Sequence, residues 1–316
     1  MIVSVSRRTD IPACYSDWFW NRLKEGYVLV RNPMNDRQGN PISRNPRAVD
    51  GFVFWTKNPL PMLRRLEELE EYPYYFQFTL TPYGRDLEPG LPSKRERLLP
   101  AFIALSEKIG PDRVVWRYDP IVFNRKYTLQ THIRCFEAMT KLLGNYTKRC
   151  VISFLDRYRK IEGWMKETGA KTPTREEIEA LGKAFSASAK KYGIELYTCC
   201  ETVDLSEFEI FHGSCVDVSL LRGCGGGSWK AEKDPGQRKE CGCAASIDIG
   251  AYDTCRNLCR YCYANRSLSV VDRNHRLHNP LSPLLYGELQ AEDRVTERKM
   301  RLLRDGQLSL FNGYYE

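Results

Sequence analysis

The chain has 316 residues, long enough for one large α/β domain with an appendage or for two domains, and its 42% hydrophobic content supports a full hydrophobic core. Its net charge of +8 permits an anionic partner but is weaker than the basic bias typical of nucleic-acid-binding domains. No stretch approaches the roughly 20 apolar residues that span a bilayer, and Arg7-Arg8 interrupts the first apolar run, so we expect a cytoplasmic protein without membrane span or signal peptide.

Short apolar runs that end in polar residues alternate with stretches of helical periodicity along the first 200 residues. The expected strands are Ile2–Ser6, Gly51–Thr56, Tyr75–Thr81, Arg113–Tyr118, Cys150–Leu155 and Ile194–Cys199, with Tyr27–Val30 as a strand or the end of a loop. The expected helices are Asp17–Lys24, Leu60–Leu69, Lys94–Lys108, Thr128–Leu143 and Thr174–Tyr192. Thr174 and Glu177 predict a capping box at the start of the last helix.

Strands that alternate with helices indicate parallel βαβ units. About six such units predict an α/β fold with a partial or complete TIM-like (β/α) barrel. A doubly wound open sheet is the alternative, although no Gly-rich dinucleotide loop follows the first strand. We expect the barrel core at residues 1–221, a cysteine-rich cluster-binding region at 222–266 and a C-terminal helical tail at 267–316.

Polar and aromatic residues follow several of the expected strands, and in a parallel barrel these carboxyl ends meet at one face, where ligands bind. Polar strand ends are also common on any surface, and such residues can serve only to tie loops together. We predict that Arg117 and Asp119 orient a ligand and that Tyr118 relays a proton or hydrogen atom, as catalytic residues. The predicted cofactor-binding residues at the strand ends are Arg7, Arg8, Asp10 and Glu201.

Nine of the twelve cysteines lie between Cys199 and Cys262. Cytosolic thiols stay reduced, so metal binding or redox chemistry is a better explanation of these cysteines than disulfides. Cys255, Cys259 and Cys262 have C-x3-C-x2-C spacing, and three thiolates on one tight loop can hold three irons of a [4Fe–4S] cluster. The fourth iron is then open to the amino and carboxylate groups of S-adenosylmethionine (SAM). A zinc knuckle is the alternative, but zinc usually takes four ligands in two pairs.

This spacing, with Tyr261 in the aromatic position before the last cysteine, resembles the signature of the radical SAM superfamily. The run from Asp248 to Ala264 is locally similar to the spore photoproduct lyase branch. Nearly the whole chain, including Ser4–Pro12 and Phe54–Pro59, resembles a bacterial family that carries the motif near its C-terminus. The resemblance implies reductive cleavage of SAM to a 5′-deoxyadenosyl radical, Tyr261 near the cofactor, and an electron donor such as flavodoxin or ferredoxin. About 250 residues precede the motif here, so no other SAM-binding motif of the superfamily is transferred.

A second metal site is expected on the cysteines that flank the motif. Its predicted ligands are Cys199, Cys215, Cys241 and Cys243, with Cys200 and Cys224 as substitutes. An auxiliary [4Fe–4S] cluster is the leading hypothesis, because Cys241-Gly-Cys243 is tighter than the usual zinc knuckle. Structural zinc and plain buried thiols are the alternatives.

The partners of the chain are less well indicated. Gln307–Phe311 resembles the short peptide by which bacterial repair proteins dock on the sliding clamp, although such a segment can also pack on its own domain. DNA or RNA is favoured as the substrate class by the net positive charge, by the local similarity to a repair lyase and by this peptide. The hypothesis from another class is a non-catalytic iron–sulfur or zinc protein that binds nucleic acid or senses redox state.

Overall fold

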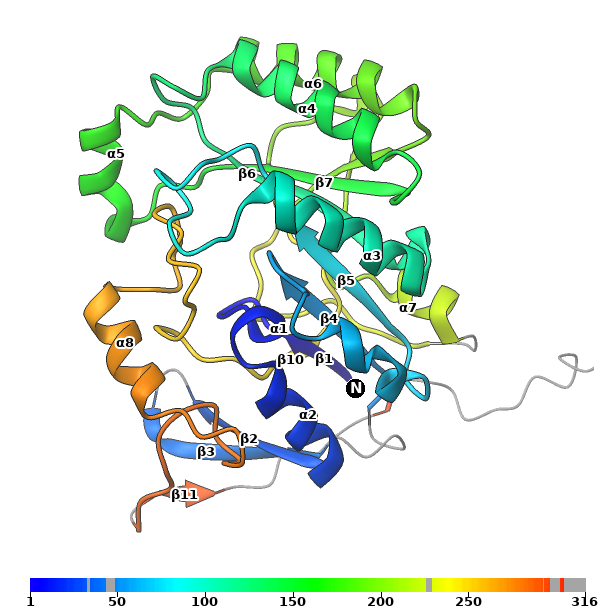
Figure 1. Cartoon of the computed structure of the whole chain (residues 1–316). Helices are drawn as coiled ribbons and strands as arrows, with labels where there is room; N and C mark the ends of the chain where they lie inside the picture. Colours follow the sequence, from blue (N-terminus) through cyan, green and yellow to red (C-terminus); the bar gives the residue numbers. More distant parts are fainter. Residues whose placement is uncertain (33–34, 44–48, 226–228, 292, 296–301, 304–316) are drawn as a thin grey trace, which may run out of the picture.

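A computed structural model describes residues 1–32, 35–43, 49–225, 229–291, 293–295 and 302–303 (Figure 1). Its centre is an eight-stranded sheet in which every neighbouring pair is parallel, in the order β10-β1-β4-β5-β6-β7-β8-β9. A smaller sheet, in the order β11-β3-β2, lies beside the first helices. The strand order places β10 beside β1, so two segments far apart in the sequence are neighbours in one sheet.

The bounds of the elements are as follows. The strands are β1 (Ile2–Val5), β2 (Tyr27–Asn32), β3 (Asn35–Ser43), β4 (Gly51–Thr56), β5 (Tyr74–Thr79), β6 (Val114–Ile121), β7 (Arg149–Phe154), β8 (Glu195–Thr198), β9 (Ile210–His212), β10 (Ser246–Asp248) and β11 (Arg294–Val295). The α-helices are α1 (Ile11–Cys14), α2 (Ser16–Glu25), α3 (Leu99–Ile109), α4 (Leu129–Leu143), α5 (Glu162–Thr168), α6 (Arg175–Lys190), α7 (Val218–Gly225) and α8 (Leu268–Arg276).

The α/β class and the strand–helix alternation are confirmed, and all six expected strands form neighbouring members of the large sheet. The capping box of α6 is present, with the Thr174 side chain accepting from the Glu177 backbone and the Glu177 side chain accepting from the Thr174 backbone. The expected helix at Leu60–Leu69 is only a 3₁₀ helix at Leu63–Leu69, with a non-helical residue at Arg65. The strands β9 and β10 were not expected.

The expected domain boundaries do not separate folded units. Residues 246–248 of the expected cluster-binding region form β10, whose Val3↔Ile247 register places it in the same sheet as β1. The expected helical tail is wrong in part, because α8 is followed by a β-strand, β11, that pairs with β3. The segment after α8 packs on α2, where Trp18 Nε1 donates to the carbonyl oxygens of Ser282 (2.9 Å) and Leu284 (3.0 Å). The peptide Gln307–Phe311 lies outside the described residues.

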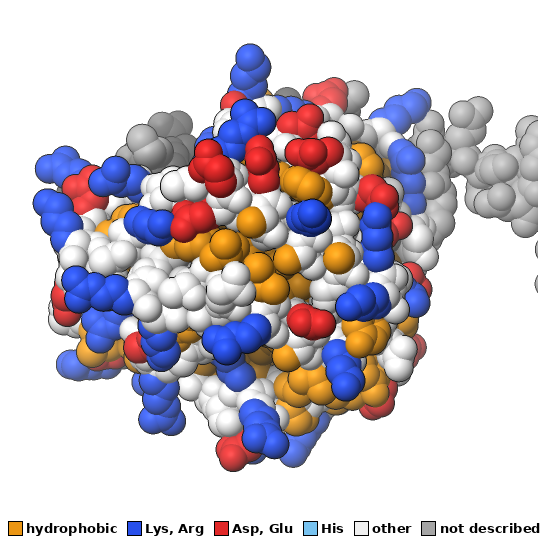
Figure 2. Space-filling view, turned by 90° about the horizontal axis from the view of Figure 1, so that it is seen from above, with side chains coloured by type: hydrophobic (Ala, Val, Ile, Leu, Met, Phe, Trp, Pro, Cys, Tyr) orange, Lys and Arg blue, Asp and Glu red, His pale blue; other side chains and the backbone are white. Residues whose placement is uncertain are grey.

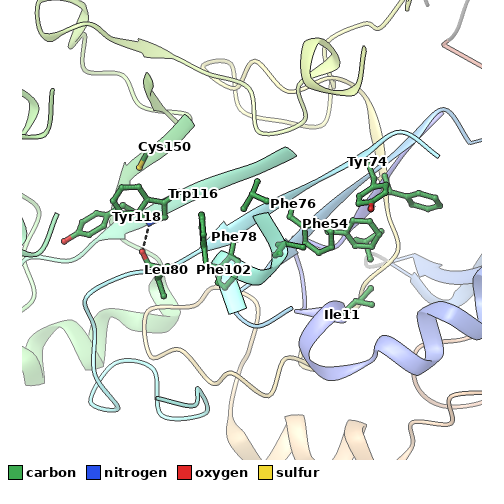
Figure 3. Close-up of a cluster of buried hydrophobic side chains, with 14 of the residues drawn as sticks. Ile11, Phe54, Tyr74, Phe76, Phe78, Leu80, Phe102, Trp116, Tyr118 and Cys150 are labelled. Atoms are coloured by element: carbon green, nitrogen blue, oxygen red, sulfur yellow. Dashed lines mark hydrogen bonds between the residues drawn. The ribbon is translucent and has the colours of Figure 1, made fainter. Parts of the chain in front are cut away.

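The main core lies between the outer side of the sheet and the helices α1 to α4 and α6 (Figures 1 and 3). Phe54 and Phe76 stack across β4 and β5 with ring centroids 4.7 Å apart, and Trp116 of β6 stacks on Phe136 of α4 at 5.0 Å. Trp116 Nε1 is satisfied by the carbonyl oxygen of Leu80. Since successive side chains of a strand point to opposite faces, the residues between these aromatics face the other side of the sheet.

The inner face of the sheet carries a second apolar cluster. Ile2, Val53, Tyr75, Val115 and Val151 come from five adjacent strands and pack against residues 215–216 and 241–244. The cysteine-bearing segment therefore covers the inside of the curved sheet, and its position is set by ordinary hydrophobic burial.

The surface is mixed in charge. On the face shown in Figure 2, basic and acidic side chains are scattered among hydrophobic and uncharged ones. Within the described residues, no helix is both long and apolar enough to cross a membrane.

Candidate functional site

A cavity of about 590 Å³ opens at the carboxyl ends of the parallel strands. Its wall includes Arg7 after β1, Lys57 after β4, Arg117 and Asp119 on β6, and Glu201 after β8. Cysteines of both predicted metal sites line it: Cys262 of the C-x3-C-x2-C motif, and Cys199, Cys215, Cys241 and Cys243 of the second site. This volume falls in the range of small-molecule sites, about 300–1,000 Å³.

The loop of Cys255, Cys259 and Cys262 follows β10 and turns tightly beside the cavity. Leu258, just before the second cysteine, has φ 52°, a left-handed conformation that a bulky residue rarely adopts. Asp253 and Arg266 close the base of the loop with an ion pair of 2.7 Å. All three cysteines are half-buried, and among the described side chains no hydrogen bond joins their thiols to one another. The three thiols are thus presented by one tight loop.

A buried ion network fixes the aromatic residue of this loop. The carboxylate of Glu88, only 1% exposed, accepts hydrogen bonds from Tyr261 Oη, Lys94 Nζ and Lys57 Nζ, the last at 2.8 Å. Lys57 Nζ also donates to Tyr261 Oη at 3.0 Å. Burial raises the pKa of Glu88, but the two ammonium groups outweigh it and lower the pKa to about 2. Two cations beside one carboxylate leave a net positive charge near the Cys259 thiol.

Asp10 and Gly90 also hold the cysteine loop in place. Asp10 Oδ2 accepts from Asn257 Nδ2 (2.8 Å) and from the backbone of Lys57 (2.7 Å), while Oδ1 caps α1. Gly90 donates its backbone N–H to the carbonyl of Asn257 at 3.1 Å. A Cβ at Gly90 would overlap the carbonyl oxygen of Arg256 and lie 2.8 Å from that of Asn257, so this close approach requires glycine.

Cys14 lies next to the motif, a position that the sequence did not indicate. Its thiol, at the end of α1, is in hydrogen-bond contact with the Cys255 thiol, and this contact raises the pKa of Cys14 and lowers that of Cys255. No local spacing links Cys14 to Cys255, since the two positions are 241 apart in the sequence.

Arg117 and Asp119 form a buried pair between the cavity and the second cysteine group. Arg117 Nη2 lies 2.6 Å from Asp119 Oδ2, and Ser153 Oγ donates to Asp119 Oδ1. The other edge of the guanidinium is occupied as well, because Nη1 donates to the Cys215 sulfur at 2.9 Å and to Gln77 Oε1 at 3.2 Å. Arg117 is therefore a fixed cation between Asp119 and the second cysteine group.

The four cysteines of the expected second site are brought together. Cys199 Sγ lies 2.9 Å from Cys215 Sγ. The Cys243 thiol is in hydrogen-bond contact with those of Cys215 and Cys241, and it also accepts the Val216 N–H at 3.4 Å. Cys200, the alternative to Cys199, lines the cavity but contacts none of these three thiols among the described interactions.

Of the cofactor-binding residues predicted at the strand ends, three line the cavity and one does not. Arg7 and Arg8 line the cavity, and the Arg7 backbone donates to Asp248 Oδ2 at 2.7 Å. Glu201 lines it too, and burial raises its pKa to about 7 although it accepts the Phe154 N–H at 2.8 Å. Asp10 lies behind the cysteine loop, and its contacts tie α1, Lys57 and the loop together rather than lining the cavity.

The prediction for Tyr118 needs correction. It lies between Arg117 and Asp119 on β6, so its side chain points to the opposite face of the sheet. There it is fully buried against Phe136 and Phe185, and its hydroxyl contacts His132 Nδ1 at 2.9 Å. Its place in the helix-facing core excludes contact with a ligand in the cavity.

The site contains residues that sequence reasoning missed. Lys57 stands at the end of an expected strand and could have been selected by that position. Glu88 and Lys94 lie in a loop and an expected helix, and no local signal links them to Tyr261. Among the described residues, no group of three or more His, Cys, Asp or Glu side chains stands in positions that could hold a metal ion, so either cysteine group would have to adjust its side chains to bind one.

Comparison with known proteins adds a family. The model of the family described as "Domain of unknown function (DUF1848)" matches residues 2–264, which include all the cysteines named above. No curated protein matches the chain.

Proposed function

The chain belongs to the DUF1848 family, and we propose that it is a radical SAM enzyme with a catalytic [4Fe–4S] cluster on Cys255, Cys259 and Cys262. The observation that carries the proposal is the placement of this three-thiol loop at the carboxyl-end cavity of a parallel sheet, with Tyr261 and Cys262 in the cavity wall. The proposed fold of the core is a partial (β/α) barrel, since eight parallel strands run in one direction around the cavity.

The three thiols suit such a cluster in number and spacing. Each cysteine of a cubane site binds a different iron, so its ligand sulfurs must stand apart, and no described hydrogen bond joins these three thiols. The positive charge of Lys57 near Cys259 offsets the negative charge of bound thiolates. When bound, a cluster of this kind supplies one electron that cleaves a carbon–sulfur bond of SAM and yields the 5′-deoxyadenosyl radical.

The residues of the chain have separate roles in this proposal. The network around Glu88 holds Tyr261 and hence the cysteine loop. Arg7, Arg8 and Glu201 bind polar groups of SAM or substrate at the cavity wall. Arg117 and Asp119 orient the substrate from the opposite side. A ligand with an anionic group and a planar ring fits a wall that combines these arginines with Trp55 and tyrosines, and nucleic acid is the substrate class that we favour.

Iron and sulfide content tests whether a cluster binds at the cysteine loop. Anaerobically reconstituted full-length protein should bind iron and sulfide at the cysteine loop, and Cys259→Ala should lower both by about four atoms per chain, as loss of one cubane cluster requires. Cys150→Ala is the matched control, because Cys150 is a buried core thiol remote from both cysteine groups. Equal iron and sulfide in wild type and Cys259→Ala would refute a cluster at this loop.

The contact between Cys14 and Cys255 favours a second candidate, a non-catalytic zinc protein in which Cys14 is the fourth ligand, since sulfurs in contact suit one metal ion better than a cubane cluster. Such a closed site would leave no iron for SAM. The same iron assay on Cys14→Ala separates the candidates, because a three-cysteine cluster should keep its iron in this variant. We favour three ligands because Cys14 contacts only Cys255 of the three motif thiols.

A further inference from the structure

The second cysteine group differs from the first in how its sulfurs are spaced. Cys199 and Cys215 are in direct thiol contact at 2.9 Å, and Cys243 contacts both Cys215 and Cys241. All four thiols therefore form one continuous group in the apolar cluster on the inner face of the sheet, whereas no described hydrogen bond joins the three thiols of the loop at Cys255. Four sulfurs around one tetrahedral zinc, with bonds of about 2.3 Å, lie roughly 3.8 Å from each other. A cubane cluster needs wider spacing, because each cysteine binds a different iron.

The group also lies at a particular place in the fold. Cys199 follows β8, Cys215 follows β9, and Cys241 and Cys243 precede β10. The strands β9 and β10 are the two outer members of the large sheet. The described contacts between the segments beyond them include the Ala244 N–H to the Val216 carbonyl (3.0 Å) and Ser214 Oγ to the Gly242 carbonyl (2.7 Å). The thiols thus sit where strand pairing does not close the sheet.

The electrostatic surroundings suit a four-thiolate ion. Zinc with four thiolates carries a net charge of about −2, which requires a counter-charge when it is buried. Arg117 places positive charge beside the site, since its guanidinium donates to the Cys215 sulfur, although Asp119 shares that charge. Cys215 is 2% exposed and Cys243 is 3% exposed, so solvent contact at these two sulfurs is small.

We propose that Cys199, Cys215, Cys241 and Cys243 bind a single tetrahedral zinc ion that staples the β8–β9 edge of the sheet to the segment entering β10. The site has four protein ligands and no open position, as structural zinc sites do. It replaces the auxiliary iron–sulfur cluster expected from the Cys241-Gly-Cys243 spacing. Because its ligands are separate from the loop at Cys255, this inference stands or fails independently of the proposed radical chemistry.

Metal analysis of the full chain tests the inference. Cells are grown with both iron and zinc, and zinc, iron and sulfide are measured in anaerobically purified protein. We expect about one zinc per chain, retained when Cys255, Cys259 and Cys262 are all replaced by Ala. Cys243→Ala should lose most of it, while Cys200→Ala, the matched control beside Cys199, should keep it. Far-UV circular dichroism shows whether Cys243→Ala is still folded.

A second readout does not depend on any variant. Replacing zinc by cobalt(II) in the wild-type chain should give the visible absorption of a tetrahedral cobalt–thiolate centre. About four irons with sulfide, and no zinc, in the variant lacking the three motif cysteines would overturn the inference in favour of a second cluster. Wild-type protein that binds neither zinc nor cobalt would show that these are plain buried thiols.

Discussion

Replacing Glu88 with Gln should lower the free energy of unfolding by about 3 kcal/mol at pH 7, because it leaves Lys57 and Lys94 buried without their counter-charge. The pKa of Glu88, about 2 instead of the ordinary 4.5, predicts a loss of the same order. Urea unfolding of the metal-free protein, followed by circular dichroism, measures this difference. Glu67→Gln is the control, since Glu67 pairs with Lys108 on the surface, and it should leave the unfolding midpoint unchanged.

The loss of stability in Glu88→Gln should also depend on pH. A carboxylate whose folded pKa is lowered contributes stability above its unfolded pKa and loses that contribution as pH falls toward its folded pKa. The difference between wild type and Glu88→Gln should therefore be full at pH 7 and narrow progressively from about pH 4.5 toward pH 2. A difference that is below about 0.5 kcal/mol at pH 7, or that widens in acid, would mean that the ion network does not stabilise the fold.

Replacing Gly90 with Ala should destabilise the protein by about 2 kcal/mol, because the new methyl group must displace the backbone of the cysteine loop at Arg256 and Asn257. The same displacement should reduce iron retained after reconstitution, since the loop carries Cys255 and Cys259. Urea unfolding and iron content of one preparation measure the two effects.

Gly163→Ala provides the comparison for Gly90. Gly163 lies in α5, where an added Cβ meets no atom within 4 Å, so alanine should be neutral or stabilising by up to about 1 kcal/mol. If Gly90→Ala behaved like Gly163→Ala in stability and in iron content, the close support of the cysteine loop by residue 90 would be refuted.

The large sheet could be predicted because its strands are buried on both faces and read as continuous apolar runs. Gly51–Thr56 was predicted with its observed bounds, and the other five expected strands differ from the observed ones by a few residues at their ends. The strand β10 could not be found in this way. It has three half-buried residues, Ser246–Asp248, and its place beside β1 depends on long-range contacts such as Ser6 Oγ with Asp248 Oδ1 (2.5 Å).

In the candidate site, too, some residues could be predicted from local sequence pattern and others could not. Position at a strand end indicated Arg7, Arg117 and Asp119, which all line the cavity. The error at Tyr118 was avoidable, because the two-residue period of a strand cannot place three consecutive side chains on one face.

Other parts of the site could not be read from local pattern. Glu88 and Cys14 reach the cysteine loop across 173 and 241 positions of the sequence, to Tyr261 and Cys255 respectively. The grouping of Cys199, Cys215, Cys241 and Cys243 was predicted from their number and place in the chain, but the close spacing of their sulfurs required the structure.

The proposal of radical SAM chemistry is tested most directly by SAM cleavage. Anaerobically reconstituted protein is incubated with dithionite and SAM, and 5′-deoxyadenosine is measured by chromatography, with DNA added in a parallel sample. We expect 5′-deoxyadenosine from wild type and from Cys14→Ala and none from Cys259→Ala. Absence of the product with and without DNA, together with no change in the cluster's EPR signal on addition of SAM, would contradict the account and leave a cluster that does not act on SAM.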